Sequence, residues 1–232
     1  MVDVKPISTS FVVGQHLIVE PPAFRSLVGA LQYLTITRVN FSFSVNFICQ
    51  FMHAPTEDHF CALKSILRYI KGTVHYSLQL QQQSTHELLA YSDVDLVGFP
   101  DTRRSTGYTI FLGSNLISWS SKKQSTVSRS SAEAEYRSLA VTIADIAWIV
   151  QLLRDLRVTL STSPTLYCDN ESAIFMAINP VTLPRSKHIA IDYHFVHDLV
   201  ANGSLKLQFV PSSLQLPDSL TKGESKPQFF LF

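Results

Sequence analysis

The sequence predicts an α/β fold, in which a mixed β-sheet is flanked by helices and preceded by a small helical region. Apolar residues recur at helical spacing before residue 80, whereas apolar strand-like runs appear after residue 88. Two of these runs form a hairpin pattern, and the later runs alternate with helical patterns, which is typical of a sheet with helices on its faces. The length of 232 residues and the 46% hydrophobic content allow a substantial core.

Five segments are expected along the chain. They are an N-terminal tail over residues 1–20, a helical region over 21–80, a polar linker over 81–87, the α/β domain over 88–223 and a tail over 224–232. In the helical region, one buried stripe is expected to contain Phe24, Leu27, Val28, Leu31 and Leu34. A second helix is expected from about residue 57 to 70, with Leu67 on its buried side and Thr56 as its N-cap.

The α/β domain is predicted to begin with three strands in a meander. The expected strands are 88–96, 107–112, 115–120, 165–168 and 205–210, and the expected helices are 131–156, 171–178 and 191–202. Gly113-Ser114 lies between the second and third strands and indicates a tight hairpin turn. Trp119 and Trp148 are both expected in the core.

Composition excludes some classes of protein and leaves others open. Charged residues make up 16% of the chain and the formal net charge is +1, so a surface for nucleic acid would have to be local. No apolar run approaches the roughly 18 residues that span a bilayer, and no membrane association is expected. The three cysteines are too far apart for a zinc motif, which favours reduced thiols and a cytoplasmic, intracellular location.

Acidic residues in the last 140 or so positions form the candidate site. Asp93 and Asp169 end strand-like runs, Glu135 lies in the first turn of a long helix, and Asp218 follows the last strand. Carboxylates gathered at one edge of a sheet are suitable ligands for Mg²⁺ in phosphodiester cleavage. The order of these acids therefore points to a metal-dependent nuclease.

Helical geometry separates two neighbouring glutamates. Glu135 continues the apolar stripe of Leu139, Ile143, Ile146, Val150 and Leu153, and therefore faces the sheet. Glu133 lies about 200° around the helix and has the Ser-x-x-Glu spacing of a capping box with Ser130. We assign Glu135 to chemistry and Glu133 to capping.

Two other assignments stay open on geometry alone. Asp93 and Asp95 alternate along one strand and share a face, so the position of Asp93 within the apolar run favours it only weakly. Asp169 lies between a strand and a helix, where an aspartate often serves only as an N-cap.

Several sequence runs together carry a family resemblance. They are Tyr91-Ser92-Asp93, Ser130-Ser131-Ala132-Glu133-Ala134-Glu135-Tyr136, Tyr167-Cys168-Asp169-Asn170 and Asp218-Ser219-Leu220-Thr221-Lys222-Gly223, preceded by the runs 24–34 and 67–73. In this order they cover about residues 22–223. The chain resembles the C-terminal part of copia-type LTR retrotransposon Pol polyproteins, comprising the end of the reverse transcriptase and the ribonuclease H domain.

The resemblance implies a ribonuclease H fold, with a five-stranded mixed sheet whose second strand is antiparallel to the others. It implies Asp93, Glu135, Asp169 and Asp218 as catalytic acids that hold two Mg²⁺ ions, with Mn²⁺ as a substitute. One ion would activate water and the other would stabilise the leaving oxygen. The implied reaction is hydrolysis of the RNA strand of an RNA/DNA hybrid during reverse transcription.

The resemblance also implies partners. The hybrid would be recognised through 2′-hydroxyls and backbone phosphates, and the candidate contacts are Arg103, Arg104, Lys122, Lys123 and Arg129, all expected in loops. The chain has no Tyr-x-Asp-Asp motif of a polymerase, so the polymerase region of the same polyprotein is an expected partner. An active element would be found in a cytoplasmic virus-like particle.

There are two alternatives to an active ribonuclease H. One is a retrotransposon-derived remnant that folds or binds hybrid without cutting it. The other is a transposase or integrase on the same fold, which the copia-type motifs argue against.

Overall fold

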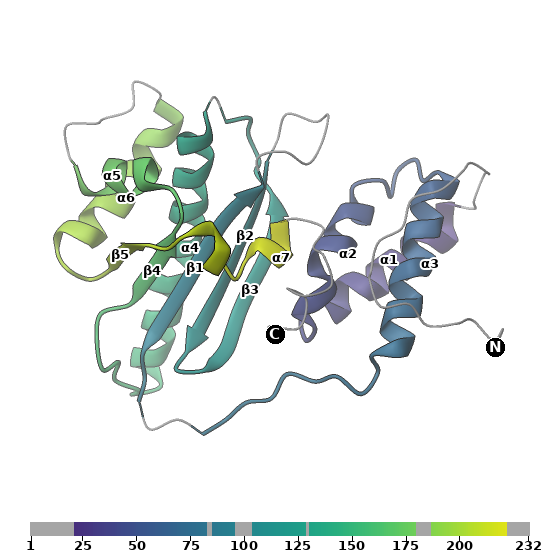
Figure 1. Cartoon of the computed structure of the whole chain (residues 1–232), viewed down its shortest axis with the longest axis horizontal. Helices are drawn as coiled ribbons and strands as arrows, with labels where there is room; N and C mark the ends of the chain where they lie inside the picture. Colours follow the sequence, from purple (N-terminus) through teal and green to yellow (C-terminus); the bar gives the residue numbers. More distant parts are fainter. Residues whose placement is uncertain (1–20, 83–84, 96–103, 129, 180–186, 222–232) are drawn as a thin grey trace. The chain divides into compact units, whose positions relative to one another are not determined.

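The structure is a computed structural model of the chain, and Figure 1 shows its course. It describes residues 21–82, 85–95, 104–128, 130–179 and 187–221. At positions 21, 187–191 and 218–219 only the backbone is described. The described residues divide into two compact units, 21–79 and 80–221.

The first unit consists of helices. These are α1 (Pro21–Leu34), the short 3-10 helix η1 (Val39–Phe41), α2 (Ser42–Cys49) and α3 (Glu57–Gly72). All four contribute to one apolar core, which includes Phe24, Val28, Leu31, Phe41, Val45, Ile48, Leu63 and Ile66. Leu27, Leu34 and Leu67 are exposed, so the buried stripes of α1 and α3 are narrower than predicted.

The N-terminus of α3 is capped by Thr56, as predicted, and His59 is a second capping residue that was not expected. Thr56 caps the helix, and the backbone N–H of Thr56 donates to His59 Nδ1 at 3.0 Å, which completes a reciprocal capping box. The His59 ring stacks on Phe51 with ring centroids 3.8 Å apart. Burial lowers the pKa of His59, because desolvation disfavours the charged ring.

The second unit is built on a five-stranded mixed sheet. The strands are β1 (Leu88–Asp95), β2 (Ser105–Leu112), β3 (Asn115–Lys123), β4 (Thr165–Cys168) and β5 (Lys206–Phe209), in the order β3-β2-β1-β4-β5. β2 is antiparallel to β1 and β3, whereas β4 is parallel to β1 and β5. The ribonuclease H fold class, with its antiparallel second strand, is confirmed.

The hairpin between β2 and β3 turns where the sequence predicts. Gly113 has a φ of 60°, a left-handed conformation that glycine adopts without steric cost. β3 continues to Lys123 and is longer than the predicted run, because its pairing with β2 extends to Ser105 opposite Lys123. Lys122 and Lys123 therefore lie in a strand, and their assignment to a loop was wrong.

Helices lie on both faces of the sheet (Figure 1). They are α4 (Ser131–Asp155), α5 (Glu171–Ile178), α6 (Lys187–Ala201), the 3-10 helix η2 (Ser212–Leu214) and α7 (Asp218–Thr221). α4, α5 and α6 share an apolar core with the face of the sheet that carries Ala90, Ile110 and Leu166. The short helix α7 packs on β1, β2 and β3 from the opposite face, beside Gly107.

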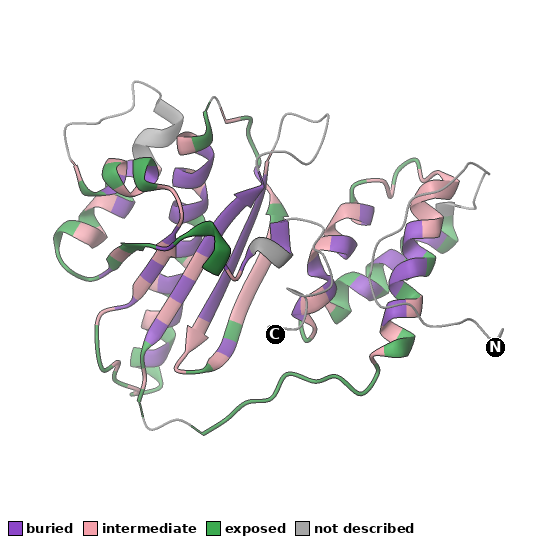
Figure 2. Ribbon diagram, in the orientation of Figure 1, coloured by how far each residue is buried: buried purple, intermediate pink, exposed green. Residues whose placement is uncertain are grey.

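The long helix α4 follows the predicted stripe along most of its length. Leu139, Ile143, Ile146 and Leu153 are buried, in agreement with the helical periodicity, and Figure 2 shows the buried residues along the sheet-facing side. Trp148 is 65% exposed, so its expected place in the core was wrong. By length and composition alone α4 would be able to cross a membrane, but its apolar stripe packs against the sheet, as expected for a core helix.

Candidate active site

Asp93 lies on β1, at the point where the buried side chains of the strand change from apolar to polar. It is 2% exposed and is paired across the sheet with Gly107. Thr221 Oγ1 donates a hydrogen bond to Asp93 Oδ2, and Ser138 Oγ donates to the Asp93 backbone carbonyl at 3.3 Å. Asp93 therefore contacts α7 through its buried carboxylate and α4 through its backbone carbonyl. Asp95 shares this face by alternation and is paired with Ser105.

Glu135 enters the same region from the first turn of α4. It is 3% exposed, as expected for a residue that continues the buried stripe. Ser130 Oγ accepts from the Glu133 backbone N–H at 3.1 Å, which confirms Ser130 as the N-cap. The Glu133 carboxylate bonds Arg137 Nη2 at 2.8 Å, so the two glutamates of the motif have different surroundings.

Asp169 immediately follows β4. The N-cap of α5 is its neighbour Asn170, whose Oδ1 accepts from the Ala173 backbone N–H at 3.0 Å. Ser212 Oγ donates to Asp169 Oδ2 at 2.7 Å. Because Asn170 supplies the cap, the alternative role of Asp169 as the N-cap of α5 is excluded.

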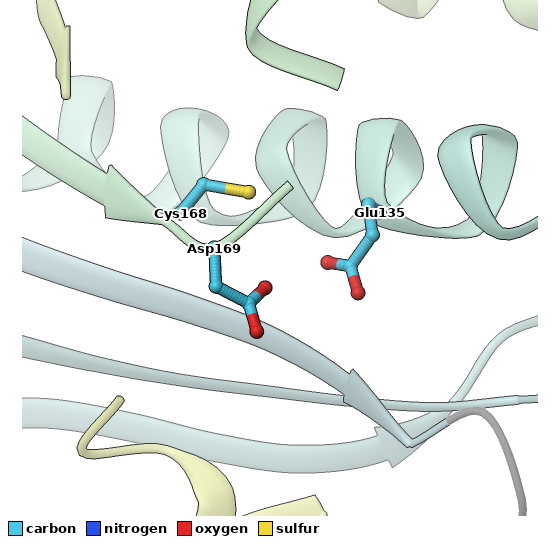
Figure 3. A group of neighbouring side chains, drawn as sticks. All are labelled: Glu135, Cys168 and Asp169. Carbon is cyan, nitrogen blue, oxygen red and sulfur yellow. The ribbon is translucent and has the colours of Figure 1, made fainter. Parts of the chain in front are cut away.

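The carboxylates of Glu135 and Asp169 come together with a thiol. Ligand atoms of Glu135, Cys168 and Asp169 all lie within 4.8 Å of one another. Figure 3 shows the two carboxylates next to each other between α4 and the end of β4. Such an arrangement of oxygen atoms from two elements can hold a divalent cation.

Cys168 was not among the residues selected from the sequence. Burial raises the pKa of its thiol, and the negative charges of Glu135, Asp169 and Asp93 raise it further. The thiol therefore stays protonated and is a poor ligand for a hard cation such as Mg²⁺. The alternation of β4 was the only available signal, since it places Cys168 on the same face as Leu166, towards α4.

Asp218 is the first residue of α7, and only its backbone is described. Thr221, which bonds Asp93, belongs to the same helical turn. The backbone of Asp218 is thus held near Asp93 by this turn.

The predicted nucleic-acid contacts are described only in part. Arg103 and Arg129 lie outside the described residues. Arg104 precedes β2 and is half-buried. Lys122 and Lys123 line a cavity of about 480 Å³ together with Arg137 of α4. Asp145 and Asp192 also line this cavity, so it brings basic and acidic side chains together.

Comparisons with known proteins identify relatives over nearly the whole chain. The chain is 46% identical over 237 residues to a retrovirus-related Pol polyprotein from transposon RE1 of Arabidopsis thaliana, covering 99% of the chain and 16% of the relative. It is 34% identical over 210 residues to a retrovirus-related Pol polyprotein from transposon TNT 1-94 of Nicotiana tabacum, covering 90% of the chain and 16% of the relative. No family model matches the chain.

Among solved structures, the chain resembles the foamy viral protease-reverse transcriptase in complex with RNA/DNA hybrid. The TM-score is 0.51 at 13% identity, over 92% of this chain and 27% of that one. This likeness concerns the fold. On the sequence matches, the chain belongs to the retrovirus-related Pol polyproteins of transposons, and it spans about one sixth of the length of these relatives.

Proposed function

We propose that the second unit is a ribonuclease H that hydrolyses the RNA strand of RNA/DNA hybrids by two-metal catalysis. The observation that carries this proposal is the meeting of the Glu135 and Asp169 carboxylates at the end of β4. The negative charge of Asp93 also raises the pKa of the Cys168 thiol, which belongs to the same cluster. Family membership supports the reaction class, and the foamy viral enzyme, whose complex contains an RNA/DNA hybrid, supports the hybrid as a ligand.

The donor chemistry of this cluster fits magnesium better than a softer metal. Its acids offer carboxylate oxygens, which Mg²⁺ and Mn²⁺ prefer, and its one sulfur is a protonated thiol. Asp93, Glu135, Asp169 and Asp218 would hold two ions. When bound, the ions would supply a nucleophilic water, and their positive charge would stabilise the leaving oxygen.

The protein residues fix the geometry in which this chemistry takes place. Thr221 bonds the carboxylate of Asp93, and Ser138 bonds its backbone carbonyl. Ser130 caps the helix that carries Glu135. Preorganised charge of this kind costs no reorganisation during the reaction. Arg104, Lys122 and Lys123 would contact the phosphates of the hybrid.

We further propose that the first unit is the last part of a reverse transcriptase, of the thumb or connection type. The polymerase region of the same polyprotein would then be the partner that supplies hybrid to the nuclease. Reverse transcription in cytoplasmic virus-like particles would be the setting.

The test is cleavage of an end-labelled RNA strand in an RNA/DNA hybrid, with and without Mg²⁺. We expect Mg²⁺-dependent cleavage by the unmodified chain and a loss of more than about 100-fold in Asp93→Asn, Glu135→Gln and Asp169→Asn, since even partners outside the metal's own ligands cost ~10–100-fold. Asp155→Asn, an exposed acid at the end of α4, is the matched control.

Two outcomes would reject parts of the proposal. Binding of hybrid by the folded chain without cleavage would favour an inactive remnant. Equal activity in the three variants and the control would show that other residues hold the metal.

A further inference from the structure

The hydroxyl of Thr221 contacts Asp93, a buried acid of the site. Thr221 is 0% exposed, and its Oγ1 donates to Oδ2 of Asp93 across a sequence separation of 128 residues. Ser121 Oγ, on β3, donates to the backbone carbonyl of the neighbouring Leu220 at 2.5 Å. Hydrogen bonds therefore join α7 to two strands. Thr221 bonds Asp93 on β1, and Leu220 bonds Ser121 on β3.

Gly107 makes the space for this contact. A Cβ atom added at Gly107 would lie 2.6 Å from Thr221 Cγ2, 3.1 Å from Leu220 Cβ and 3.3 Å from the Pro217 carbonyl. Real Cβ atoms do not approach another atom as closely as the first of these distances. Because Gly107 is paired with Asp93 across β1 and β2, the missing side chain lies where α7 must approach the carboxylate.

We propose that Thr221 is a positioning residue, which fixes the orientation of the Asp93 carboxylate for metal binding. The inference rests on the proposed function of the site. A buried carboxylate that is held by a donor on a rigid turn loses less freedom when it binds a cation, so the donor should increase metal affinity. Gly107 acts through the same contact, because it admits the turn that carries the hydroxyl.

A purely structural role for Thr221 would have a different signature. If its only task were to pack α7 onto the sheet, the methyl group would matter and the hydroxyl would not. Loss of packing would lower the melting temperature without changing the metal affinity of the folded fraction. Metal affinity and thermal stability therefore have to be measured on the same variants.

Two matched pairs isolate the hydroxyl. Thr221→Val has nearly the shape of threonine and lacks the donor. Thr221→Ser and Thr221→Ala both lack Cγ2 and differ only in the donor. The second pair keeps the test valid if the valine variant fails to fold.

The readouts are calorimetric binding of Mn²⁺ alone and the Mg²⁺ concentration for half-maximal hybrid cleavage. We expect Thr221→Val, compared with the unmodified chain, to weaken Mn²⁺ binding by about 10–100-fold, and Thr221→Ala to do so compared with Thr221→Ser. The KM for hybrid should change little, because Thr221 is fully buried.

Gly107→Ala adds an independent check. It should weaken Mn²⁺ binding because the new Cβ displaces Thr221, and Thr221→Ser in the same chain should restore part of the loss because it removes the clashing Cγ2.

The outcomes separate the two proposals. Equal Mn²⁺ affinity within both matched pairs overturns the positioning role of Thr221. An unmodified chain that binds Mn²⁺ but leaves hybrid intact overturns the proposed function, and Thr221 is then judged by binding alone. An unmodified chain that binds no Mn²⁺ overturns both.

Discussion

The two halves of helix α4 differ in the polar side chains that they bury against the sheet. Glu135, Ser138 and Thr142 are buried in its first half among apolar residues, whereas the buried residues of its second half are the apolar Ile146, Ile149 and Leu153. β1 shows a similar difference, because Ser92 and Asp93 are buried beside Val94, whereas its first half buries only Leu88 and Ala90. One end of the unit thus has an apolar core, and the other buries polar groups among its apolar side chains.

The apolar end and the polar end of the unit should therefore contribute differently to the stability of the fold. Burial of apolar side chains stabilises the folded state, but buried polar groups cost free energy unless they are fully paired. In the described part of the chain, buried Ser92 Oγ and Thr109 Oγ1 have no hydrogen-bond partner, and each such atom costs about 1–3 kcal/mol. The polar end therefore contributes little stability, and the proposed metal site gives a reason for its composition.

The largest expected effect on stability lies in the apolar region. Ile146 is buried in the core that α4 shares with the sheet, so Ile146→Ala should lower the free energy of unfolding by about 2–5 kcal/mol through lost burial and a cavity. Chemical denaturation measures the change. Leu152→Ala, at a 40% exposed position of the same helix, is the control and should cost far less. Equal losses in the two variants would show that burial in the apolar core is not what stabilises this end of the unit.

Cys168 lies beside the carboxylates of Glu135 and Asp169, and we expect it to make the site sensitive to soft metals. Cd²⁺ favours sulfur ligands and should displace the thiol proton, joining Cys168 to Glu135 and Asp169. We expect Cd²⁺ to inhibit hybrid cleavage, and Cys168→Ser to raise the inhibitory concentration about 10-fold, equivalent to ~1.4 kcal/mol. Inhibition curves at fixed Mg²⁺ provide the measurement. Identical curves would mean that the thiol does not reach the metal.

Removing a charge from the polar region should stabilise the protein. The carboxylates of Glu135 and Asp169 repel each other in the absence of cations, so Glu135→Gln should raise the free energy of unfolding by about 0.5–2 kcal/mol in a chelator. Added Mg²⁺ should reverse the order by stabilising only the unmodified chain. Thermal melts with and without Mg²⁺ measure both effects. A lower melting temperature for Glu135→Gln in chelator would show that the acid supports the fold.

The smallest expected effect lies in the helical unit and depends on pH. The pKa of His59 is lowered in the fold, so below the ordinary value of 6.5 the unfolded chain takes up a proton that the folded unit resists. The stability that His59 contributes is thus present above that pH and is lost as the pH falls through the window beneath it. Melts at several pH values measure it.

A variant can separate this pH response from the titration of the acids. His59→Gln keeps an acceptor at the third position of the capping box and does not titrate. It should abolish the part of the pH dependence that belongs to the helical unit. An unchanged pH profile would assign the response to other groups.

Local patterns predicted much of the fold. β4 and α5 have the predicted bounds, because a short apolar run and a capped helix leave few alternatives. Helix α2 was not predicted, since its β-branched and aromatic residues have weak helix propensity and its packing in the core determines its conformation. Trp148 shows the same limit, because periodicity cannot tell which flank of a helix is left uncovered.

Less of the site could be predicted. The stripe of α4 selected Glu135 over Glu133, because burial follows helical period. The contacts of Asp93 with Thr221 and of Asp169 with Ser212 join residues far apart in the sequence, and no local pattern encodes them. Cys168 has the same difficulty, since its role depends on neighbours from another element.

The order of these segments in the chain also has a consequence for synthesis. Because Asp93 and Thr221 are 128 residues apart, their hydrogen bond cannot form until almost the whole unit has been translated. At about 5–20 residues per second, several seconds separate the emergence of β1 from that of α7. The proposed nuclease site would therefore be complete only after translation has passed α7.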